Sequence, residues 1–598
     1  MSTYENRLKA LREELAARKL AGFVVPLTDE HMSEYVGAYA QRLAWLTGFQ
    51  GSAGSAVVMP EEAAIFTDGR YTLQVREQVD GDHYEYVSIP GTSISGWLGA
   101  HADNGARIGY DPWLHTRQWV ETAQKTLAEK GAELVAVDTN PIDAIWPDKP
   151  APSGARLIVH SDEDAGRSSA QKRQDMAEWL SGKNADAAVL AALDSIAWTF
   201  NIRGADVDHM PVALAYALVN RDGTADLFVD PGKMSPEVAQ HLGNGVRVHP
   251  RDAFEGALAD MKGKTVVADP GSAVAAIFQA LDDGGAKILA EREPAVLPKA
   301  IKNPAEISGH RAAQERDGAA LTRFLHWLSL EAPQGGVTEM SAAKKLREFR
   351  EQSGLLRDLS FDTISGAGPH AAIPHYRVTE ESSIPLDMDR IYLVDSGGQY
   401  ADGTTDVTRT VIVGTPTAEM RDRFTRVLKG HIALATAVFP KDTRGSQLDA
   451  FARQYLWAAG LDYGHGTGHG VGSYLGVHEG PQRISAANYP GTGWDEPLKA
   501  GMILSNEPGY YKGGEFGIRI ENLVVIGERT IEGGEAEMLG FETLTFAPID
   551  RKLIDTDLLV PHERDWVDGY HAEVVARIGP QLDEETAAWL DEVCAPLD

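Results

Sequence analysis

The stretch Ile391 to Val413, "IYLVDSGGQYADGTTDVTRTVIV", decides the fold of the second half of this 598-residue chain. Apolar residues occupy both of its ends, and a glycine-rich centre containing Asp402-Gly403 is typical of a tight turn, so the stretch predicts a β-hairpin. Asp395 and Asp406 interrupt the two strands, and their midpoint lies close to the turn. We therefore expect these two carboxylates to face each other across the strand pair.

A second stretch has the same layout. "GMILSNEPGYYKGGEFGIRIENLVVIG", Gly501 to Gly527, has its turn at Gly513-Gly514, and Glu507 and Glu521 lie at equal separations on either side of Gly514. Like charges opposite each other destabilise a sheet, and burying carboxylates among apolar strands without cations is costly. Two acid pairs supply four negative charges, which match two divalent ions. Asp402, beside its turn glycine, is expected to be an ordinary turn residue.

A glycine-rich segment supplies imidazoles for the same site. In "GHGTGHGVG", Gly464 to Gly472, His465 and His469 have the spacing of two metal ligands on a helix, yet five of the nine residues are glycine. Each glycine costs a helix about 1 kcal/mol relative to alanine, so a loop is expected, and either histidine can complete the site. An oxygen shell with one imidazole suits Mn²⁺, and two ions bridged by carboxylates form a hydrolytic centre.

A covalent mechanism has no support in the sequence. The chain has no GxSxG motif, and its one cysteine, Cys594, lies close to the C-terminus. We therefore expect neither catalysis by a serine or cysteine nucleophile nor a metal site built from cysteines.

Five motifs occur in an order that resembles the pita-bread metallopeptidases: "VDSGGQYADGTTDVTRT", "GHGTGHGVG", "VHEGP", "SNEPGYY" and "GIRIEN". The set is most similar to the Xaa-Pro aminopeptidases, also called aminopeptidase P. "SFDTISG" and "IPHYR" add matches upstream. "GFQGSAGSAVV" and "TDGRY" resemble the first domain of the three-domain cytosolic members, and "PIDRKLID" and "ERDWVDGYH" resemble their C-terminal extension. The resemblance spans nearly the whole chain.

The resemblance implies different roles for the two histidines, since His469 matches the family's metal ligand and His465 matches a histidine that contacts the bound peptide. It implies a dinuclear site with a bridging water or hydroxide, in which the ligands are Asp395, Asp406, His469, Glu507 and Glu521. Asp406 and Glu521 are implied to bridge the two ions. Glu507 is also implied to accept the proton of the attacking water and to deliver one to the leaving nitrogen.

Further residues match the substrate side of the family's site. His375 and His478 match residues that flank the scissile carbonyl and the proline, and Arg519 and Tyr511 match residues that orient ligands and substrate. His370 is an additional imidazole near His375, and it is expected to be a hydrogen-bonded core residue.

The first 300 residues show one α/β plan twice. In each copy a helix, a strand, a tryptophan-containing segment, a strand ending in an aspartate turn and a helix follow one another, so that Trp45 corresponds to Trp198 and Asp68 to Asp230. Two segments with several prolines each, Pro147 to Arg156 and Glu291 to Glu306, are expected to separate the parts. The expected fold is α/β and α+β, with creatinase-like N-terminal domains at 1–155 and 156–300 and a pita-bread catalytic domain at 301–598 that includes a C-terminal extension from about 547.

Composition excludes several partners. The chain has 56 basic and 87 acidic residues and a formal charge of −31, which argues against binding nucleic acid or a membrane through a basic surface. The longest apolar run found, "MPVALAYALV", is far shorter than the ~20 residues that span a bilayer. The N-terminal segment has no apolar signal core, so the cytoplasm is the expected location.

The resemblance implies an aminopeptidase that hydrolyses the N-terminal Xaa-Pro bond of peptides with two divalent ions, Mn²⁺ before Zn²⁺ or Co²⁺, in a homodimer. Prolidase, restricted to Xaa-Pro dipeptides, is the alternative, although chain length and the C-terminal segment favour the aminopeptidase. The long N-terminal architecture disfavours methionine aminopeptidase, and the intact ligand set disfavours creatinase. A metal-free pita-bread module that binds peptides or proteins is the alternative from another class.

Overall fold

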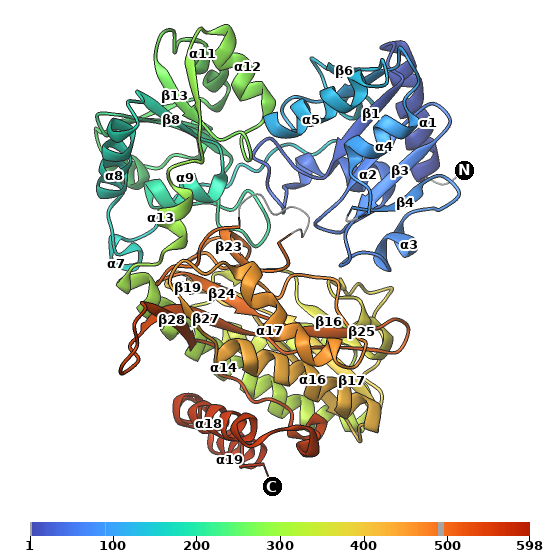
Figure 1. The fold of residues 1–598 in the computed structure, drawn as a ribbon, viewed down its shortest axis with the longest axis vertical. Helices are drawn as coiled ribbons and strands as arrows, with labels where there is room; N and C mark the ends of the chain where they lie inside the picture. Colours follow the sequence, from blue (N-terminus) through green and yellow to red (C-terminus); the bar gives the residue numbers. More distant parts are fainter. Residues whose placement is uncertain (1–2, 90, 488–494, 598) are drawn as a thin grey trace. The chain divides into compact units, whose positions relative to one another are not determined.

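The computed structural model describes residues 3–89, 91–487 and 495–597, and the chain forms two compact units (Figure 1). Unit 1 consists of Met1–Asp162 and Arg167–Val296, and unit 2 consists of Glu163–Gly166 and Leu297–Asp598. The domain boundaries predicted at 155, 300 and 547 stay predictions.

The first half of unit 1 is built on a six-stranded sheet with the order β4-β3-β2-β1-β5-β6. Its strands are β1 (Gly22–Pro26), β2 (Ser55–Val58), β3 (Ala63–Thr67), β4 (Glu85–Ser88), β5 (Arg107–Tyr110) and β6 (Glu133–Ala136). Its helices are α1 (Thr3–Ala17), α2 (Arg42–Thr47), α3 (Gln74–Gln78), α4 (Ile94–His101), α5 (Arg117–Ala128) and α6 (Pro141–Ile145). Because alternate side chains of a strand point to opposite faces, Phe23 and Val25 join the core beneath α1, whereas Val24 joins the core on the other face.

The second half of unit 1 repeats this topology. Its sheet has the order β12-β11-β10-β8-β13-β14. In the first sheet β1, β2 and β3 pair antiparallel, and in the second sheet β8, β10 and β11 do the same. All other neighbouring strands in both sheets pair parallel. Trp45 and Trp198 lie on the helices that follow the equivalent strands β1 and β8, and Asp68 and Asp230 directly follow the equivalent strands β3 and β11. The predicted repetition of one α/β plan is therefore confirmed as a shared topology.

The elements of this second half have the following bounds. The strands are β7 (Ile158–Val159), β8 (Ala187–Leu190), β9 (Ile202–Arg203), β10 (Ala215–Asn220), β11 (Ala225–Val229), β12 (Val246–His249), β13 (Thr265–Ala268) and β14 (Lys287–Ala290). The helices are α7 (Asp162–Ala165), α8 (Ser169–Gly182), α9 (Leu193–Phe200), α10 (Pro236–Leu242), α11 (Phe254–Ala259), α12 (Ala275–Asp283) and α13 (Val296–Ala300), of which α7 and α13 cross the division between the units.

Unit 2 contains a six-stranded sheet, β21-β28-β27-β24-β22-β23, two three-stranded sheets, β16-β17-β20 and β15-β18-β19, and the pair β25-β26. The strands are β15 (Asp358–Leu359), β16 (Ile364–Ala367), β17 (Arg390–Ser396), β18 (Gly398–Tyr400), β19 (Gly403–Thr404), β20 (Val407–Val413), β21 (Val438–Pro440), β22 (Gly468–Gly470), β23 (Glu479–Ile484), β24 (Ile503–Asn506), β25 (Gly509–Lys512), β26 (Phe516–Arg519), β27 (Asn522–Arg529) and β28 (Met538–Thr543).

Four long helices cover these strands: α14 (Pro304–Glu331), α15 (Glu339–Glu351), α16 (Ala418–Ala435) and α17 (Gly445–Trp457) (Figure 1). A capping box at Asn303 starts α14, since Asn303 and Glu306 satisfy each other's backbone N–H groups. The α14 residues Leu321 and Phe324 pack with Tyr392 of β17. Leu434 of α16 packs in the cluster that holds the six-stranded sheet. The helices thus pack against the strands that carry or flank the acids and hold these strands in place.

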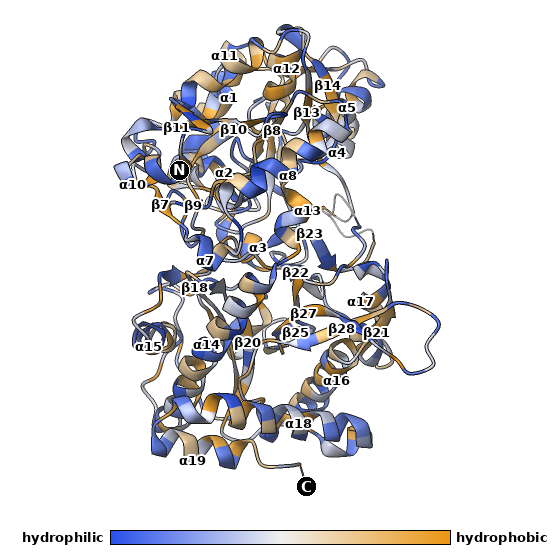
Figure 2. Ribbon diagram, turned by 90° about the vertical axis from the view of Figure 1, so that its left-hand side faces the viewer, coloured by the Kyte–Doolittle hydropathy of each residue, from blue (hydrophilic) through white to orange (hydrophobic). Residues whose placement is uncertain are grey.

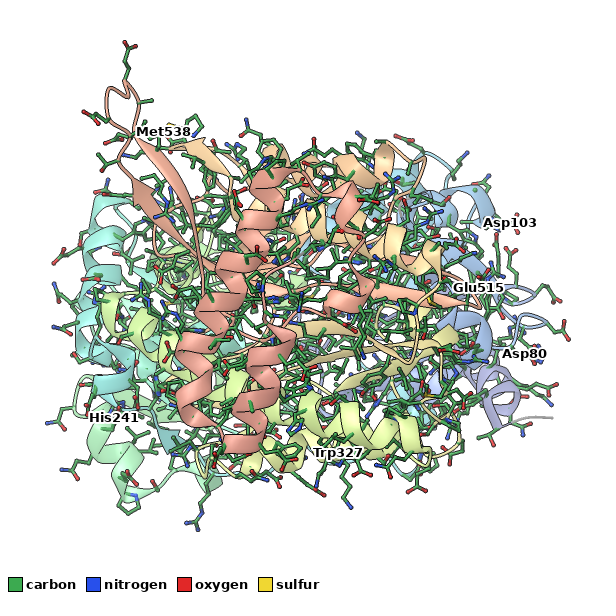
Figure 3. All side chains as sticks on the ribbon, turned by 90° about the horizontal axis from the view of Figure 1, so that it is seen from below. Asp80, Asp103, His241, Trp327, Glu515 and Met538 are labelled. Atoms are coloured by element: carbon green, nitrogen blue, oxygen red, sulfur yellow. The ribbon has the colours of Figure 1, made fainter. Side chains whose placement is uncertain are left out.

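The C-terminal segment ends in α18 (Pro561–Ile578) and α19 (Glu584–Val593), which lie side by side in the view of Figure 3. Val567, Tyr570, Val574 and Ile578 recur at helical spacing on α18 and belong to the largest core cluster of unit 2. Figure 2 shows the resulting alternation of apolar and polar positions along both helices. Among the described residues, no helix combines the length and the apolarity that crossing a membrane requires.

Candidate metal centre

The first hairpin brings its acids to one face, with a register that differs from the prediction. β17 and β20 pair so that Asp395 lies opposite Thr408 and Ser396 opposite Val407, which leaves Asp406 opposite Gly397. Asp395 and Asp406 are therefore diagonal neighbours rather than directly opposed, because the turn is centred nearer Asp402 than the apolar pattern indicated. A Cβ atom at Gly397 would lie 1.9 Å from the Thr405 carbonyl oxygen, so only glycine allows this close strand contact.

The second hairpin has the predicted symmetry. β24 and β27 pair Asn506 with Asn522, and β25 and β26 pair Gly509 with Arg519. The same register places Glu507 and Glu521 opposite each other where the two ladders meet. The predicted hairpin, with its turn at Gly513-Gly514 and one acid on each side, is confirmed.

The four carboxylates form one electrostatic cluster, in which Asp395, Asp406 and Glu521 are buried and Glu507 is partly exposed. Burial raises the pKa of Glu521 well above its usual range, and the charges of Asp406, Asp395 and Glu507 raise it further. Burial followed by repulsion from Asp395 and Glu507 raises the pKa of Asp406 in the same way. Among the described residues, Oδ1 of Asp395 and Oδ1 of Asp406 are buried without a hydrogen-bond partner. Such unpaired oxygens within a cluster of like charge fit divalent cations.

The glycine-rich segment is not helical, as predicted, because it contains the short strand β22. Gly468 and Gly470 allow this strand to pack closely between its neighbours: a Cβ atom on Gly468 would lie 2.0 Å from the Ser505 carbonyl oxygen, and one on Gly470 would lie 2.2 Å from the Gln482 amide nitrogen. The His469 N–H donates to Ser505 Oγ at 2.9 Å, which fixes this histidine against β24.

His469 directs one ring nitrogen at the acids. Its Nδ1 lies 2.9 Å from the Gly470 carbonyl oxygen, which can only accept, so Nδ1 carries the proton. With Nδ1 turned to this carbonyl, Nε2 is the ring nitrogen left to act as a ligand, and it lies 3.5 Å from both Asp406 Oδ2 and Glu507 Oε1. Ligand atoms of Asp406, His469 and Glu521 all lie within 4.8 Å of one another. An imidazole nitrogen and carboxylate oxygens that converge at this spacing form a donor set that fits a metal ion.

His465 has different contacts. Its Nδ1 lies 2.7 Å from the Gly466 carbonyl oxygen, and its Nε2 lies 2.8 Å from the Tyr511 hydroxyl. Arg519 Nη1 donates to that hydroxyl at 2.7 Å, and Arg519 Nη2 donates to Asp395 Oδ2 at 2.6 Å. Burial raises the pKa of Tyr511 to about 12, so the phenol keeps its proton and donates it to His465. His465 is thus connected to the acids through Tyr511 and Arg519, whereas His469 faces them directly.

The remaining predicted histidines continue from His469. The ring centroids of His469 and His478 are 4.4 Å apart, and those of His478 and His375 are 6.5 Å apart. His370 instead binds Glu339 at 2.9 Å, so it is hydrogen-bonded as expected, but its side chain is 24% exposed and therefore does not belong to the core. Asp402 lies outside the cluster and pairs with Arg316 at 2.9 Å.

One buried arginine behind the acids was missed by the sequence analysis. Arg409, on β20, donates to the Glu521 carbonyl oxygen at 2.7 Å, to Asn522 Oδ1 at 2.9 Å and to the Tyr570 hydroxyl at 2.8 Å. Tyr570 belongs to α18, so the C-terminal segment contacts the backbone of a predicted ligand through one side chain. The signal in the sequence was a charged residue between two threonines within an apolar strand.

Comparison with known proteins covers the whole chain. Two family models of the creatinase/prolidase N-terminal domain match residues 7–145 and 148–306. The model of metallopeptidase family M24 matches residues 308–528, and the model of the C-terminal region of this family matches residues 537–597. Probable Xaa-Pro aminopeptidases P of Aspergillus niger and Laccaria bicolor are both 41% identical over 99% of this chain, and cover 98% and 93% of their own lengths.

A solved structure agrees with this relationship. An X-prolyl aminopeptidase of Caenorhabditis elegans, described as a cytosolic enzyme with a di-nuclear active site, matches with a TM-score of 0.95 and 34% identity over 100% of both chains. These findings confirm the predicted fold class, two creatinase-type α/β domains followed by a pita-bread domain. The chain therefore belongs to metallopeptidase family M24, among the enzymes of the Xaa-Pro aminopeptidase P type.

Proposed function

We propose that this protein removes the N-terminal residue from peptides whose second residue is proline, with two divalent ions in its active site. The observation that carries the proposal is the convergence of three buried carboxylates and the partly exposed Glu507 with Nε2 of His469. Two divalent ions balance four negative charges. The Xaa-Pro specificity is supported by the names of relatives that match over their full length.

The proposed metal ligands are Asp395, Asp406, His469, Glu507 and Glu521. Asp406 and Glu521 are the proposed bridging residues, as the family resemblance implies, and both are buried next to the charges of the other acids. The mostly oxygen donor set favours Mn²⁺, with Zn²⁺ or Co²⁺ as alternatives. When bound, two such ions lower the pKa of a water molecule and stabilise negative charge that develops on a carbonyl oxygen.

Glu507 is the proposed proton acceptor. Its side chain is 17% exposed, compared with 5% for Asp406, so it is the more accessible of these two carboxylates. Ser505 Oγ donates to Glu507 Oε1 at 3.2 Å and orients the carboxylate. An oriented carboxylate next to the attacking water takes its proton and then delivers a proton to the prolyl nitrogen as that nitrogen leaves.

The histidines outside the acid cluster are proposed to hold the peptide. His478 and His375 follow His469 in one row and flank the scissile carbonyl and the proline in this proposal. His465, held by Tyr511, contacts the peptide, and Arg519 orients both Tyr511 and Asp395. A dedicated site suits Xaa-Pro bonds because proline offers no N–H and its ring fixes φ.

Substrate length separates this proposal from prolidase. The purified protein, supplied with Mn²⁺ or treated with a chelator, is given an Xaa-Pro dipeptide and the matching Xaa-Pro-Xaa tripeptide. We expect metal-dependent cleavage of the tripeptide and about two ions per chain. Cleavage of the dipeptide alone would indicate prolidase, and absence of both metal binding and cleavage would indicate a binding module.

Two further properties belong to the proposal. A homodimer in the cytoplasm is proposed, in line with the cytosolic relative. Light scattering at micromolar concentration tests the homodimer, because the mass of a monomer would contradict it. The net charge of −31 supports the expectation that neither nucleic acid nor a membrane surface is a partner.

A further inference from the structure

We propose that Glu339 is a positioning residue that fixes the loop carrying His375. This inference rests on the proposed function, since it concerns the substrate side of that site. The loop runs from the end of β16 at Ala367 to Ile384, and it consists of one short 3₁₀ turn and irregular chain before β17. His375 therefore lies outside the paired strands.

One carboxylate closes this loop at both ends. The backbone N–H of Ala367 donates to Glu339 Oε1 at 2.7 Å, and the backbone N–H of Ile384 donates to Glu339 Oε2 at 3.0 Å. Within the loop, His370 Nδ1 lies 2.9 Å from Oε1, and the Tyr376 hydroxyl donates to Oε2 at 3.1 Å. The rings of His370 and Tyr376 also stack, with centroids 4.5 Å apart.

This carboxylate is not used by its own helix. Glu339 is the first residue of α15, but Thr338 and Ser341 already form the capping box there. The side chain of Glu339 is fully buried, and buried carboxylates are costly unless hydrogen bonds compensate. The N-terminal end of the helix and four donors from one loop provide that compensation. Four donors require a group that only accepts, which is the property of a carboxylate.

The consequence for the site concerns His375. It directly precedes Tyr376, whose hydroxyl is held by Glu339, and its ring faces His478 at 6.5 Å. No contact of Glu339 involves a predicted metal ligand among those the structure describes. Glu339 therefore sets where His375 lies relative to His478, and it leaves the acid cluster unchanged. A displacement of about 1 Å in a positioning group can reduce a rate by about a hundredfold.

The substitution Glu339→Gln tests this role. Glutamine keeps the shape but presents an N–H₂ group to donors, so at least one end of the loop loses its acceptor. We expect KM for an Xaa-Pro-Xaa tripeptide to rise about tenfold or more, while the bound metal stays at the wild-type content. Hydrogen exchange should speed up at residues 367–384 in particular.

The matched control is Glu563→Gln. Glu563 is also buried near the start of a helix, accepts the Val560 N–H at 2.9 Å and binds Lys429, but it lies in the C-terminal segment. This variant should lose stability without a change in KM. Should Glu339→Gln behave in the same way as Glu563→Gln, with KM and loop exchange unchanged, the positioning role is wrong.

A milder variant keeps the test usable if Glu339→Gln does not fold. His370→Leu removes one donor from the partly exposed side of the cluster and should raise KM two- to threefold in the same direction; an unchanged KM would contradict the proposal. A wild-type protein without Xaa-Pro cleavage would contradict the proposed function instead. The hydrogen-exchange measurement still distinguishes the cases, because it reports on the loop without any substrate.

Discussion

The two sides of the site are built differently. The acids sit on or directly beside paired strands, so the register of two hairpins determines where their carboxylates lie. His375 sits on an irregular loop and is placed by contacts with a distant helix. Substitutions on the strand side, which holds the acids, should therefore remove metal. Substitutions on the loop side, which holds His375, should impair substrate binding with the metal still present.

The largest expected effect is on the strand side. Asp406→Ala removes a proposed bridging ligand, so it should lower kcat at least about a thousandfold and lose bound metal, because the other three carboxylates are already ligands in the proposed site. The assay is kcat together with metal content after dialysis. Asp402→Ala is the control, because Asp402 belongs to the same hairpin but pairs with Arg316. Normal turnover in Asp406→Ala would contradict the bridging assignment.

The second prediction compares the two histidines of one segment. His469→Ala should lose both metal and activity, because Nε2 of His469 faces the acids. His465→Ala should keep most of its metal while kcat/KM falls about a hundredfold, the scale for losing a group that positions the peptide. Metal content and turnover are measured on both variants. Equal loss of metal from the two would show that His465 is also a ligand, and the distinction between the two sides would disappear.

The strand side was also the more predictable one. Apolar alternation and turn glycines are local signals, and they placed Glu507 opposite Glu521 correctly. The same reasoning misplaced Asp406 relative to Asp395 by one diagonal step, because several glycines and Asp402 in the first turn left its centre ambiguous. The shift preserved the face on which both acids lie, so the cluster was still predicted.

Long-range partners could not be found in this way. Glu339 at the start of a helix has the pattern of an ordinary N-terminal acid, and nothing in its neighbourhood indicates a loop about 30 residues further on. Arg409 has the same difficulty, since its partner Tyr570 lies on a helix far along the chain. The roles of His375, His478, Arg519 and Tyr511 came from the resemblance, and they stay predictions.

A third prediction uses pH to test the support of the strand side. Burial lowers the pKa of His431 to about 3 and that of His571 to about 4, and both rings pack near the backs of the acid-bearing strands. The unfolded chain binds these protons near pH 6.5. The free energy of unfolding is therefore highest above pH 6.5 and falls as the pH decreases toward 4. The decrease should be about 2 kcal/mol per histidine between pH 7.5 and 5.

His571→Gln measures that contribution. Glutamine can accept the Ile549 N–H that His571 Nε2 accepts at 3.1 Å, but it does not titrate. Urea unfolding of the metal-free protein at pH 7.5 and 5 should therefore show a loss smaller by about 2 kcal/mol in the variant than in wild type. The same loss in both proteins would mean that His571 does not remain neutral in the fold.

The smallest effect should come from Tyr570→Phe, which removes a single hydroxyl behind the strand side. That hydroxyl accepts from Arg409, and Arg409 in turn donates to the Glu521 carbonyl oxygen. Without it the buried guanidinium loses one acceptor, at a cost of about 1 kcal/mol in the free energy of unfolding. Because Arg409 also holds the backbone of Glu521, the Mn²⁺ concentration that gives half-maximal activity should rise a few-fold, with KM for the peptide unchanged.

Tyr216→Phe is the matched control, since Tyr216 is a buried tyrosine of unit 1 whose hydroxyl donates to the Glu30 carbonyl oxygen at 3.3 Å. It should cost similar stability and leave metal binding as in wild type. If Tyr570→Phe instead raised KM at constant metal affinity, the C-terminal helix would act on the substrate side, and the division between strand-held metal ligands and loop-held substrate contacts would be wrong at this position.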